Sequence, residues 1–390
     1  TLARRQRNGV GILETDRPIS PVLVARLRRA GARIRVLDRW SRSVSAEVDS
    51  ATAERIARLP WVTRLESVPR LTTAAQPALA TAAPLADTLY GFSYSQLLQL
   101  DVPAAHALGV NGRGVRIGML DSGFDRNHAA FRSLRVIAAR DFIWGDTIVG
   151  NQPKDSAASG NQAFHGTATW SIVGGYQKGR YVGPAYGASF LLAKTEFLDP
   201  NNGDTHADED RWVQGAQWED SVGVDIISSS LGYRYGFPDG DYTCAQMNGR
   251  TTRTSVWAAQ LARRRILLVN SMGNEGPAAC SISAPADADS IISVGAVDSL
   301  GNVTTWSSRG PTGDGRTKPD LVARGINVFY AAVGTDSSYS SGGFGTSWAA
   351  PQIAGAAALV LQAWPTFSPM KIRSALTLSA NRISPDNNYG

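Results

Sequence analysis

The sequence predicts a three-layer α/β domain, in which a mainly parallel sheet has helices on both faces, and a small α+β module in front of it. Three observations lead to this prediction. From residue 114 onward, short continuous apolar runs alternate with segments long enough for crossover helices. Residues 1–75 instead have patterns typical of a small antiparallel sheet that carries two helices. Between the two regions, residues 72–87 are rich in Ala, Thr and Pro and lack periodicity, as in a linker.

The N-terminal module is predicted to be ferredoxin-like, because its elements follow the order β-α-β-β-α-β. Helices are expected at residues 20–31 and 51–59, where apolar residues recur at helical spacing. The expected strands cover residues 9–14, 32–40, 44–48 and 61–68. We therefore place the module at residues 1–75, a linker at 76–88 and the second domain at 89–390, whose C-terminus we expect to be truncated.

The excess of basic residues is confined to the N-terminal module. Residues 1–75 contain 15 Arg, no Lys and 7 acidic residues, a net charge of +8, whereas residues 76–390 have a net charge of −2. An Arg-rich module can bind nucleic acid, but this one has no interleaved aromatic residues and no base-reading motif. Because Arg on solvated helix faces explains the same composition, we predict no nucleic-acid partner.

The second domain has five apolar runs that are predicted to be strands buried on both faces. They cover residues 115–120, 189–194, 224–229, 266–270 and 291–297. Residues 210–222 and 255–264 are long enough for crossover helices, and residues 349–364 read as a buried helix. Ligands of such sheets bind at the carboxyl ends of the strands, so polar residues at those ends are the candidates for chemistry.

Several classes of protein are excluded by composition. No apolar run approaches the roughly 18 residues of a membrane-spanning helix, so we predict no membrane span. Cys244 and Cys280 form no CxxC pair and lie far from any His cluster, which excludes zinc-finger and thioredoxin chemistry and leaves a single disulfide open. The chain begins at Thr1 without an apolar signal segment, so we expect any upstream segment to have been removed.

Asp121 and His165 are the first candidates for a catalytic site. Asp121 ends the first buried strand of the second domain, where a carboxylate is held rigidly, although a strand-end Asp is more often a turn former. His165 opens HGTATWSIVGG, which predicts a helix that begins at the His. A lone His is more often structural. An imidazole at a helix start, however, benefits from a carboxylate that fixes its tautomer and balances its charge.

Ser347 and Asn274 could complete such a site. Ser347 stands in GGFGTSWAAPQIAG, a glycine-rich turn that leads into the apolar helix, where its hydroxyl is exposed. An N-cap is the simpler interpretation, but a cap does not need small residues on both sides. An activated hydroxyl needs a base and the base needs an orienting group, roles that His165 and Asp121 offer. Asn274, after a buried strand, is either a turn former or a donor to an oxyanion.

Together these residues resemble those of the subtilases, the subtilisin-like serine proteases. The resemblance covers roughly residues 100–380, and the order Asp, His, Ser along the chain is that of subtilisin. The motifs that carry it are DSG at Asp121, HGT at His165, SSSLG at 228–232, GNEGP at 273–277, SSRGP at 307–311, KPD at 318–320 and GTSWAAPQIAG at 345–355. The chain departs from the family pattern at Trp348, where Met is usual, at Gln352, where His is usual, and at Arg324, where Pro is usual.

The resemblance implies a serine endopeptidase with Ser347 as nucleophile, His165 as general acid and base, and Asp121 as the residue that orients His165. Asn274 and the Ser347 N–H would form the oxyanion hole. The partner would be a peptide or protein substrate, and no cofactor would be required. Structural calcium stays open, with the acidic loop 201–204 as a candidate. The alternative, a catalytically silent subtilase-fold binding protein, would normally have lost a triad residue.

The resemblance also implies which residues contact the substrate. Ser230, Leu231 and Gly232 would pair with the substrate backbone as an added strand. A primary pocket without an obvious carboxylate would favour an uncharged residue immediately before the cut. An acidic rim would favour Lys or Arg two to four residues upstream, unless those acids form a solvated loop or an ion site. The pocket residues are Ser271, Met272, Gly273 and Ser283, and the rim residues are Asp208, Glu209 and Asp210.

Residues 1–75 resemble, more faintly, the inhibitory pro-domain of subtilases. This resemblance implies a zymogen, in which the N-terminal module is the temporary inhibitor of its own protease. The opposite net charges of the two regions are electrostatically complementary, which supports that role. A retained structural domain is the alternative. Family membership would also imply a secreted or cell-envelope protein.

Overall fold

The computed structural model describes residues 19–38, 43–65, 88–155, 161–198, 206–237, 241–382 and 384–390. The chain divides into two compact units, one within residues 2–82 and one that contains residues 83–390. Except for Thr88, the predicted linker at 76–88 lies outside the described residues.

The described part of the N-terminal unit contains two helices and a two-stranded antiparallel sheet. Its elements are α2 (Pro21–Arg29), β1 (Arg33–Asp38), β2 (Ser43–Glu47) and α3 (Ser50–Ala57). Asp49 caps α3 by accepting the backbone N–H of Thr52 at 2.6 Å. Leu27, Ala32 and Ile56 form its buried core. The predicted strand at 9–14 lies outside the described residues, and residues 61–65 are not a strand.

The larger unit is built on a seven-stranded sheet in which every neighbouring pair is parallel. The strand order is β11-β10-β9-β8-β3-β7-β4. The strands are β3 (Arg116–Asp121), β4 (Arg135–Asp141), β7 (Ser189–Lys194), β8 (Ile226–Ser229), β9 (Leu267–Ser271), β10 (Ile292–Val297) and β11 (Leu321–Arg324). The predicted parallel sheet is therefore confirmed, and β4 and β11 are additions to it.

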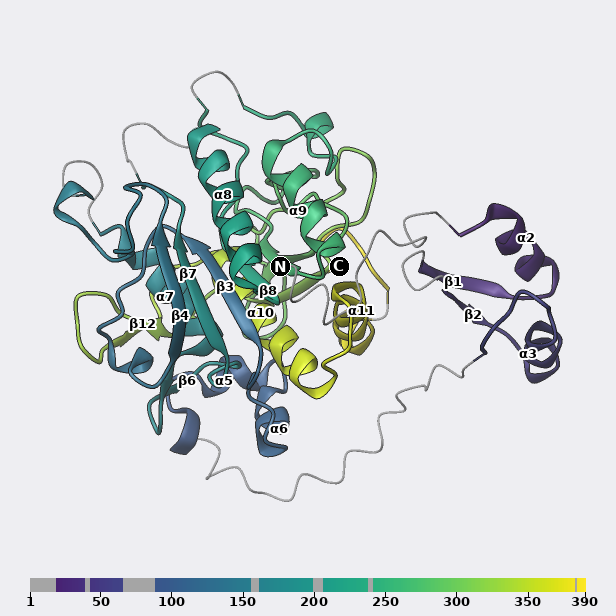
Figure 1. Cartoon of the computed structure of the whole chain (residues 1–390), viewed down its shortest axis with the longest axis horizontal. Coiled ribbons are helices and arrows are strands. Elements are labelled where there is room, and N and C mark those ends of the chain that lie inside the picture. The colour runs from purple at the N-terminus through teal and green to yellow at the C-terminus, as the bar shows by residue number, and fades with distance from the viewer. Residues whose placement is uncertain are drawn as a thin grey trace. The chain divides into compact units, whose positions relative to one another are not determined.

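Helices cover both faces of this sheet, as the prediction of three layers requires (Figure 1). On one face α10 (Thr346–Ala363) packs against β8, β9, β10 and β11, with α7 (Ala163–Gly174) and α11 (Pro369–Ser379) beside it. On the other face α8 (His206–Val222) packs against β3 and β7, and α9 (Arg253–Arg263) against β9. The smaller elements are α5 (Tyr94–Leu98), α6 (Val102–Ala107), β5 (Tyr176–Gln177), β6 (Tyr181–Val182), β12 (Tyr330–Ala331) and β13 (Tyr339–Ser340).

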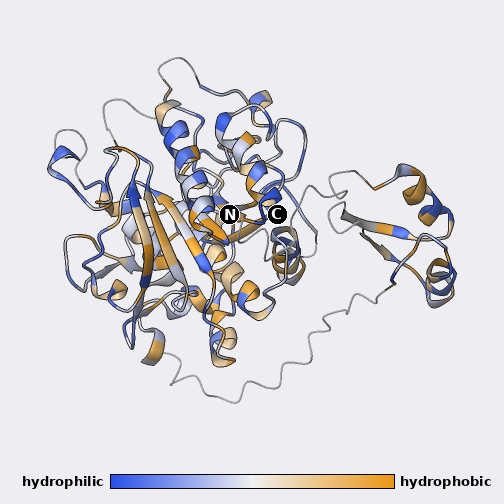
Figure 2. Ribbon diagram, in the orientation of Figure 1, coloured by the Kyte–Doolittle hydropathy of each residue, from blue (hydrophilic) through white to orange (hydrophobic). Residues whose placement is uncertain are grey.

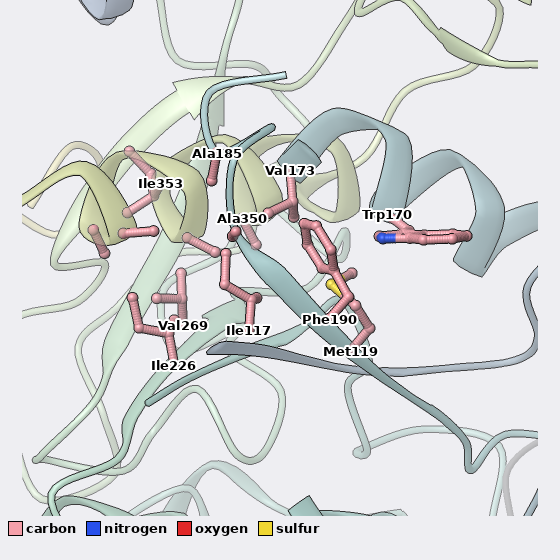
Figure 3. Close-up of a cluster of buried hydrophobic side chains, with 14 of the residues drawn as sticks. Ile117, Met119, Trp170, Val173, Ala185, Phe190, Ile226, Val269, Ala350 and Ile353 are labelled. Atoms are coloured by element: carbon pink, nitrogen blue, oxygen red, sulfur yellow. The ribbon is translucent and has the colours of Figure 1, made fainter. Parts of the chain in front are cut away.

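Each face of the sheet has its own apolar core. Figure 3 shows the cluster between the sheet and α7 and α10, where Met119 and Phe190 from neighbouring strands lie near Trp170 of α7. The cluster on the other face contains Trp212 of α8. Figure 2 shows apolar residues concentrated in the central strands, whereas α8 has hydrophilic residues along much of its length. Because the central strands are buried on both faces, they appear in the sequence as continuous apolar runs.

Two further predictions concern the chain as a whole. Among the described residues, no helix combines the length and apolar character needed to cross a membrane. Cys244 and Cys280, whose pairing the sequence left open, form a disulfide with a Cα–Cα distance of 5.9 Å.

Candidate active site

Asp121 is the last residue of β3, and its carboxylate is buried at the carboxyl end of the sheet. Its Oδ1 accepts the backbone N–H of Ser122 at 2.8 Å and Nδ1–H of His165 at 2.7 Å. Its Oδ2 accepts the hydroxyl of Thr169, one turn further along α7, at 2.9 Å. A carboxylate with donors on both oxygens has a fixed orientation, so it can in turn fix the imidazole.

His165 is the third residue of α7, so the helix begins two residues earlier than the sequence predicted. Gly166 makes the close approach to β3 possible, because a Cβ there would lie 2.2 Å from the carbonyl oxygen of Gly123 and 2.9 Å from Cβ of Asp121. Burial acts to lower the pKa of His165, but the charge and hydrogen bond of Asp121 outweigh it, so the pKa is raised above its usual value. The ring is thereby prepared to take up a proton.

Ser347 is the second residue of α10. Its hydroxyl donates to the backbone carbonyl of Ser230 at 3.1 Å, and the Ser230 hydroxyl donates to the carbonyl of Ser347 at 2.9 Å. No hydrogen bond joins Ser347 to His165 among the described residues. A nucleophilic role would require the Ser347 hydroxyl to rotate from Ser230 toward the imidazole, and catalytic hydrogen bonds are often incomplete in a protein without substrate.

The side-chain amide of Asn274 and the backbone N–H of Ser347 both lie beside Gly345. A Cβ at Gly345 would lie 3.5 Å from the Ser347 nitrogen and 3.7 Å from Nδ2 of Asn274. The Asn274 side chain is held from its other end, because Oδ1 accepts the backbone N–H of Thr346 at 2.8 Å. This bond leaves the Nδ2 donor directed away from Thr346. Two fixed donors around one space are the arrangement that stabilises a developing oxyanion.

The predicted substrate segments lie together beside this site. A Cβ at Gly232 would lie 3.1 Å from Cβ of Ser283, and the backbone N–H of Ser283 donates to the carbonyl of Met272 at 3.0 Å. The Met272 side chain is completely buried, in a cluster with Met247 and Ile282, so it cannot line a pocket as predicted. Ser271, Leu231 and Ser230 are also largely buried, and what they can offer a substrate is mainly backbone.

Glu275 is a residue that sequence reasoning missed at the primary pocket. Its Oε2 accepts the backbone N–H of Asn274 at 2.8 Å and the hydroxyls of Ser308 at 3.0 Å and Ser283 at 3.4 Å. The turn after Asn274 brings the Glu275 carboxyl group back over Gly273 and Ser283, two of the residues predicted to line the primary pocket, where the sequence suggested no carboxylate. The signal was present in the GNEGP motif itself.

The predicted acidic rim is also corrected by the structure. Asp208 and Glu209 are buried in the first turn of α8, where Asp208 pairs with Arg211 and Glu209 accepts the hydroxyl of Tyr242. Asp210 is half exposed, but it pairs with Arg253 at the start of α9. Two of the three acids are buried and the third is paired with an Arg, so together they do not present the exposed acidic rim that the sequence predicted.

Among the described residues, no group of three or more His, Cys, Asp or Glu side chains is placed to hold a metal ion. The acidic loop at 201–204, which the sequence left open as a calcium site, lies outside the described residues.

Comparisons with known proteins agree with this geometry. Residues 112–390 match the subtilase family, and residues 1–81 match the peptidase S8 propeptide domain of Bacteroidota. Subtilisin DY of Bacillus licheniformis is 29% identical over 291 residues, covering 73% of this chain and 90% of that protein. The subtilisin-like protease PopC of Myxococcus xanthus is 30% identical over 302 residues, covering 72% of this chain and 58% of PopC. A crystal structure of a cold adapted subtilisin-like serine proteinase superposes with a TM-score of 0.55 at 22% identity, covering 72% of this chain and 88% of that one.

Proposed function

The chain belongs to the subtilase family and is a subtilisin-like serine endopeptidase with its own N-terminal propeptide domain, and we propose that Asp121, His165 and Ser347 carry out its reaction. The Ser347 Oγ attacks a peptide carbonyl carbon while its proton passes to Nε2 of His165. The resulting oxyanion accepts hydrogen bonds from the Ser347 N–H and from Nδ2 of Asn274. Collapse expels the amine, which takes the proton from His165, and leaves an acyl-enzyme that water then hydrolyses.

One observation supports this proposal most strongly. The Asp121–His165 hydrogen bond of 2.7 Å and the two donors around Gly345 come from separate segments of the chain, yet they meet at the carboxyl ends of the strands. A binding protein has no need for an oriented imidazole or for two unused donors aimed at one space. The same geometry therefore favours catalysis over the catalytically silent alternative.

The test is expression of the full chain, removal of its N-terminal module, and labelling of the resulting enzyme with a serine-directed fluorophosphonate, followed by mass analysis and a casein hydrolysis assay. Modification confined to Ser347, together with casein cleavage, is the expected result. The matched control is Ser347→Ala, which should neither be labelled nor cleave casein, while its thermal unfolding stays close to that of the wild type. Casein cleavage by Ser347→Ala at the wild-type rate would refute the mechanism.

Substrate is proposed to bind as an added strand along residues 230–232. These residues follow β8, and the next residue, Tyr233, forms an antiparallel bridge with Ala284, so the backbone beside the pocket is already extended. Glu275 and Ser283 border the position of the side chain that precedes the cut. Exchanging Glu275 for Gln should change the choice of that side chain, which a peptide library with varied residues before the cut would measure.

The N-terminal module is proposed to inhibit the protease until it is removed. The propeptide match at residues 1–81 supports this role, and so do the net charges of +8 and −2 on the two regions. Added as a separate polypeptide, the module should inhibit the mature enzyme less as salt rises, because part of the attraction is long-range. Activity unchanged by a large excess of the module would favour a retained structural domain instead.

Secretion is the location that fits these features. The Cys244–Cys280 disulfide favours an oxidising compartment, and a propeptide delays activity until export is complete. Fractionation of the producing cells, with immunodetection of the mature enzyme, would test this location.

A further inference from the structure

The imidazole of His165 lies at the end of a stack of aromatic rings. The centroids of the His165 and Trp348 rings are 5.3 Å apart and their planes differ by 31°. Tyr330 continues the stack, with its ring 5.0 Å from that of Trp348 and an angle of 27°. Phe164 meets Trp348 edge-on, at 6.5 Å and 86°. His165 is thus held by Asp121 at its Nδ1 edge and by an indole against its ring.

Trp348 is itself fixed by its surroundings. It is 4% exposed and belongs to a buried cluster with Ala168 and Ile172 of α7, Val328 and Tyr330. Its Nε1 has no hydrogen-bond partner among the described residues, so the indole is positioned by packing alone. As the residue after Ser347 in α10, it links the nucleophile and the base through one rigid side chain.

An indole in this position has an electrostatic effect on the imidazole. The face of an indole carries negative potential and attracts a cation whose centre lies within about 6 Å of the ring centroid. The 31° tilt excludes an edge-on contact between the two rings, so the imidazole meets the face of the indole. His165 becomes a cation each time Ser347 transfers its proton. Water screens such an attraction weakly at a buried residue such as Trp348.

We propose that Trp348 is a positioning residue for catalysis, whose indole holds the imidazole of His165 from the ring face and stabilises the imidazolium formed while Ser347 reacts. The proposal rests on the role of His165 as the general base. It assigns an electrostatic function to a position where relatives usually carry Met, whose side chain has no ring quadrupole.

The effect of Trp348 on the imidazole can be measured separately from that of Asp121, the charged group that acts on His165. Asp121 of β3 acts on the imidazole by charge and hydrogen bond, and no other charged group of the described elements around it, α7 and α10 included, is found to act on it. The neighbours on α10 and β12, Trp348 and Tyr330, contribute aromatic rings and neither a carboxylate nor a basic group. A change at residue 348 therefore alters one partner of the imidazole and leaves Asp121 in place.

The test replaces Trp348 by mono-, di- and trifluorotryptophan through stop-codon suppression, because fluorine withdraws charge from the ring with almost no change of shape. The full chain is used with Ser347→Ala to prevent self-digestion, and its histidine rings are isotope-labelled. With only four His in the chain, the His165 resonances can be assigned from the His165→Asn variant and titrated by NMR. We expect the His165 pKa to fall stepwise with each fluorine. Trp348→Leu should lower this pKa by about half a unit to one unit.

A matched control separates packing from electrostatics. Tyr330→Leu removes a ring from the same cluster without removing the ring that contacts His165, so it should lower the unfolding temperature and leave the His165 pKa unchanged. In the active enzyme, the pKa that governs the fall of kcat/KM at acid pH should shift with each substitution in the same direction as the His165 pKa measured by NMR. A His165 pKa that is equal in all fluorinated proteins would overturn the proposal. Failure of the wild-type enzyme to cleave casein after its N-terminal module has been removed would instead overturn the proposed function, and the titration would still report on Trp348.

Discussion

Two carboxyl groups are buried beside β3. One belongs to Asp121, the last residue of the strand, and the other to Glu219 of α8, which lies against Gly118 in the middle of the strand, and the two differ in their hydrogen-bond partners. Asp121, at the end of the strand, accepts hydrogen bonds from Ser122, His165 and Thr169. Glu219 reaches the middle of the same strand from α8, and neither of its oxygens has a hydrogen-bond partner among the described residues. A Cβ at Gly118 would lie 2.0 Å from Oε2 of Glu219, so the carboxyl group fills the space that this glycine leaves.

The difference shows that donors, rather than depth, decide what a buried acid does. Burial raises the pKa of Glu219 well above its usual range. The backbone N–H of Met119 lies close enough to offset part of this effect, although it completes no hydrogen bond of normal geometry to either oxygen. Burial therefore favours the protonated form of Glu219, whose carboxyl group fills the space beside Gly118. Asp121 has donors because a strand end leaves room for the turn and for α7, whereas the middle of a parallel strand has already committed its N–H groups to its neighbours.

The largest expected effect comes from removing the charge of Asp121. Asp121→Asn keeps the size of the side chain but favours the wrong tautomer of His165, so kcat should fall by about 10⁴-fold. Fluorophosphonate labelling and peptide hydrolysis would measure the loss, and thermal unfolding would confirm that the protein is folded. Activity within tenfold of the wild type would mean that Asp121 does not orient the base.

The next effect concerns the contact beneath the strand. Gly118→Ala would place a methyl group against the carboxyl group of Glu219, which cannot move away because it is completely buried, and should destabilise the protein by about 1–3 kcal/mol. Glu219→Ala in the same molecule should recover part of that loss, because it removes the clashing group. A double-mutant cycle would measure this, with urea unfolding of both single variants and the double variant in the Ser347→Ala background. Losses of unfolding free energy that add in the double variant would show that the two residues do not interact.

The pH dependence of stability should reveal Glu219 directly. Its pKa is raised in the folded protein, so between the unfolded value of about 4.3 and the folded value the native state retains a proton that the unfolded chain loses. The wild type should therefore lose stability as pH rises through this window, and Glu219→Gln should lack that loss. Urea midpoints from pH 4 to pH 9 would measure the difference. A constant difference across this range would contradict a protonated Glu219.

The smallest effect is expected from removing one of the hydrogen bonds that Asp121 accepts. Thr169→Val removes one hydrogen bond to Oδ2 and leaves those from Ser122 and His165, so kcat/KM should fall about three- to tenfold. Thr169→Ser, which retains the hydroxyl, should restore most of the rate. Equal rates for Val and Ser at this position would show that Thr169 contributes packing only.

The residues of the candidate site could be located from the sequence because each lies in a local pattern. Asp121 follows a continuous apolar run, His165 opens a helical pattern, and Ser347 stands in a glycine-rich turn before an apolar helix. The edge strand β4 was missed because most of its residues are exposed or half buried, so it has no continuous apolar run. The acidic rim was predicted without two partners, Tyr242 and Arg253, that become neighbours of the acids only through folding. Arg211, three residues after Asp208 on the same helix, is a local partner.

By itself the sequence determined the layered α/β fold and the residues that the subtilase motifs mark, because hydrophobic periodicity and strand-end residues depend on short stretches of chain. Only the tertiary structure decided that Glu275 contacts Ser283, that Met272 is buried, that Cys244 and Cys280 are joined, and that Trp348 lies against His165. Each of these depends on segments distant in sequence that meet through the packing of helices on the sheet. Local sequence patterns cannot predict such contacts between distant segments.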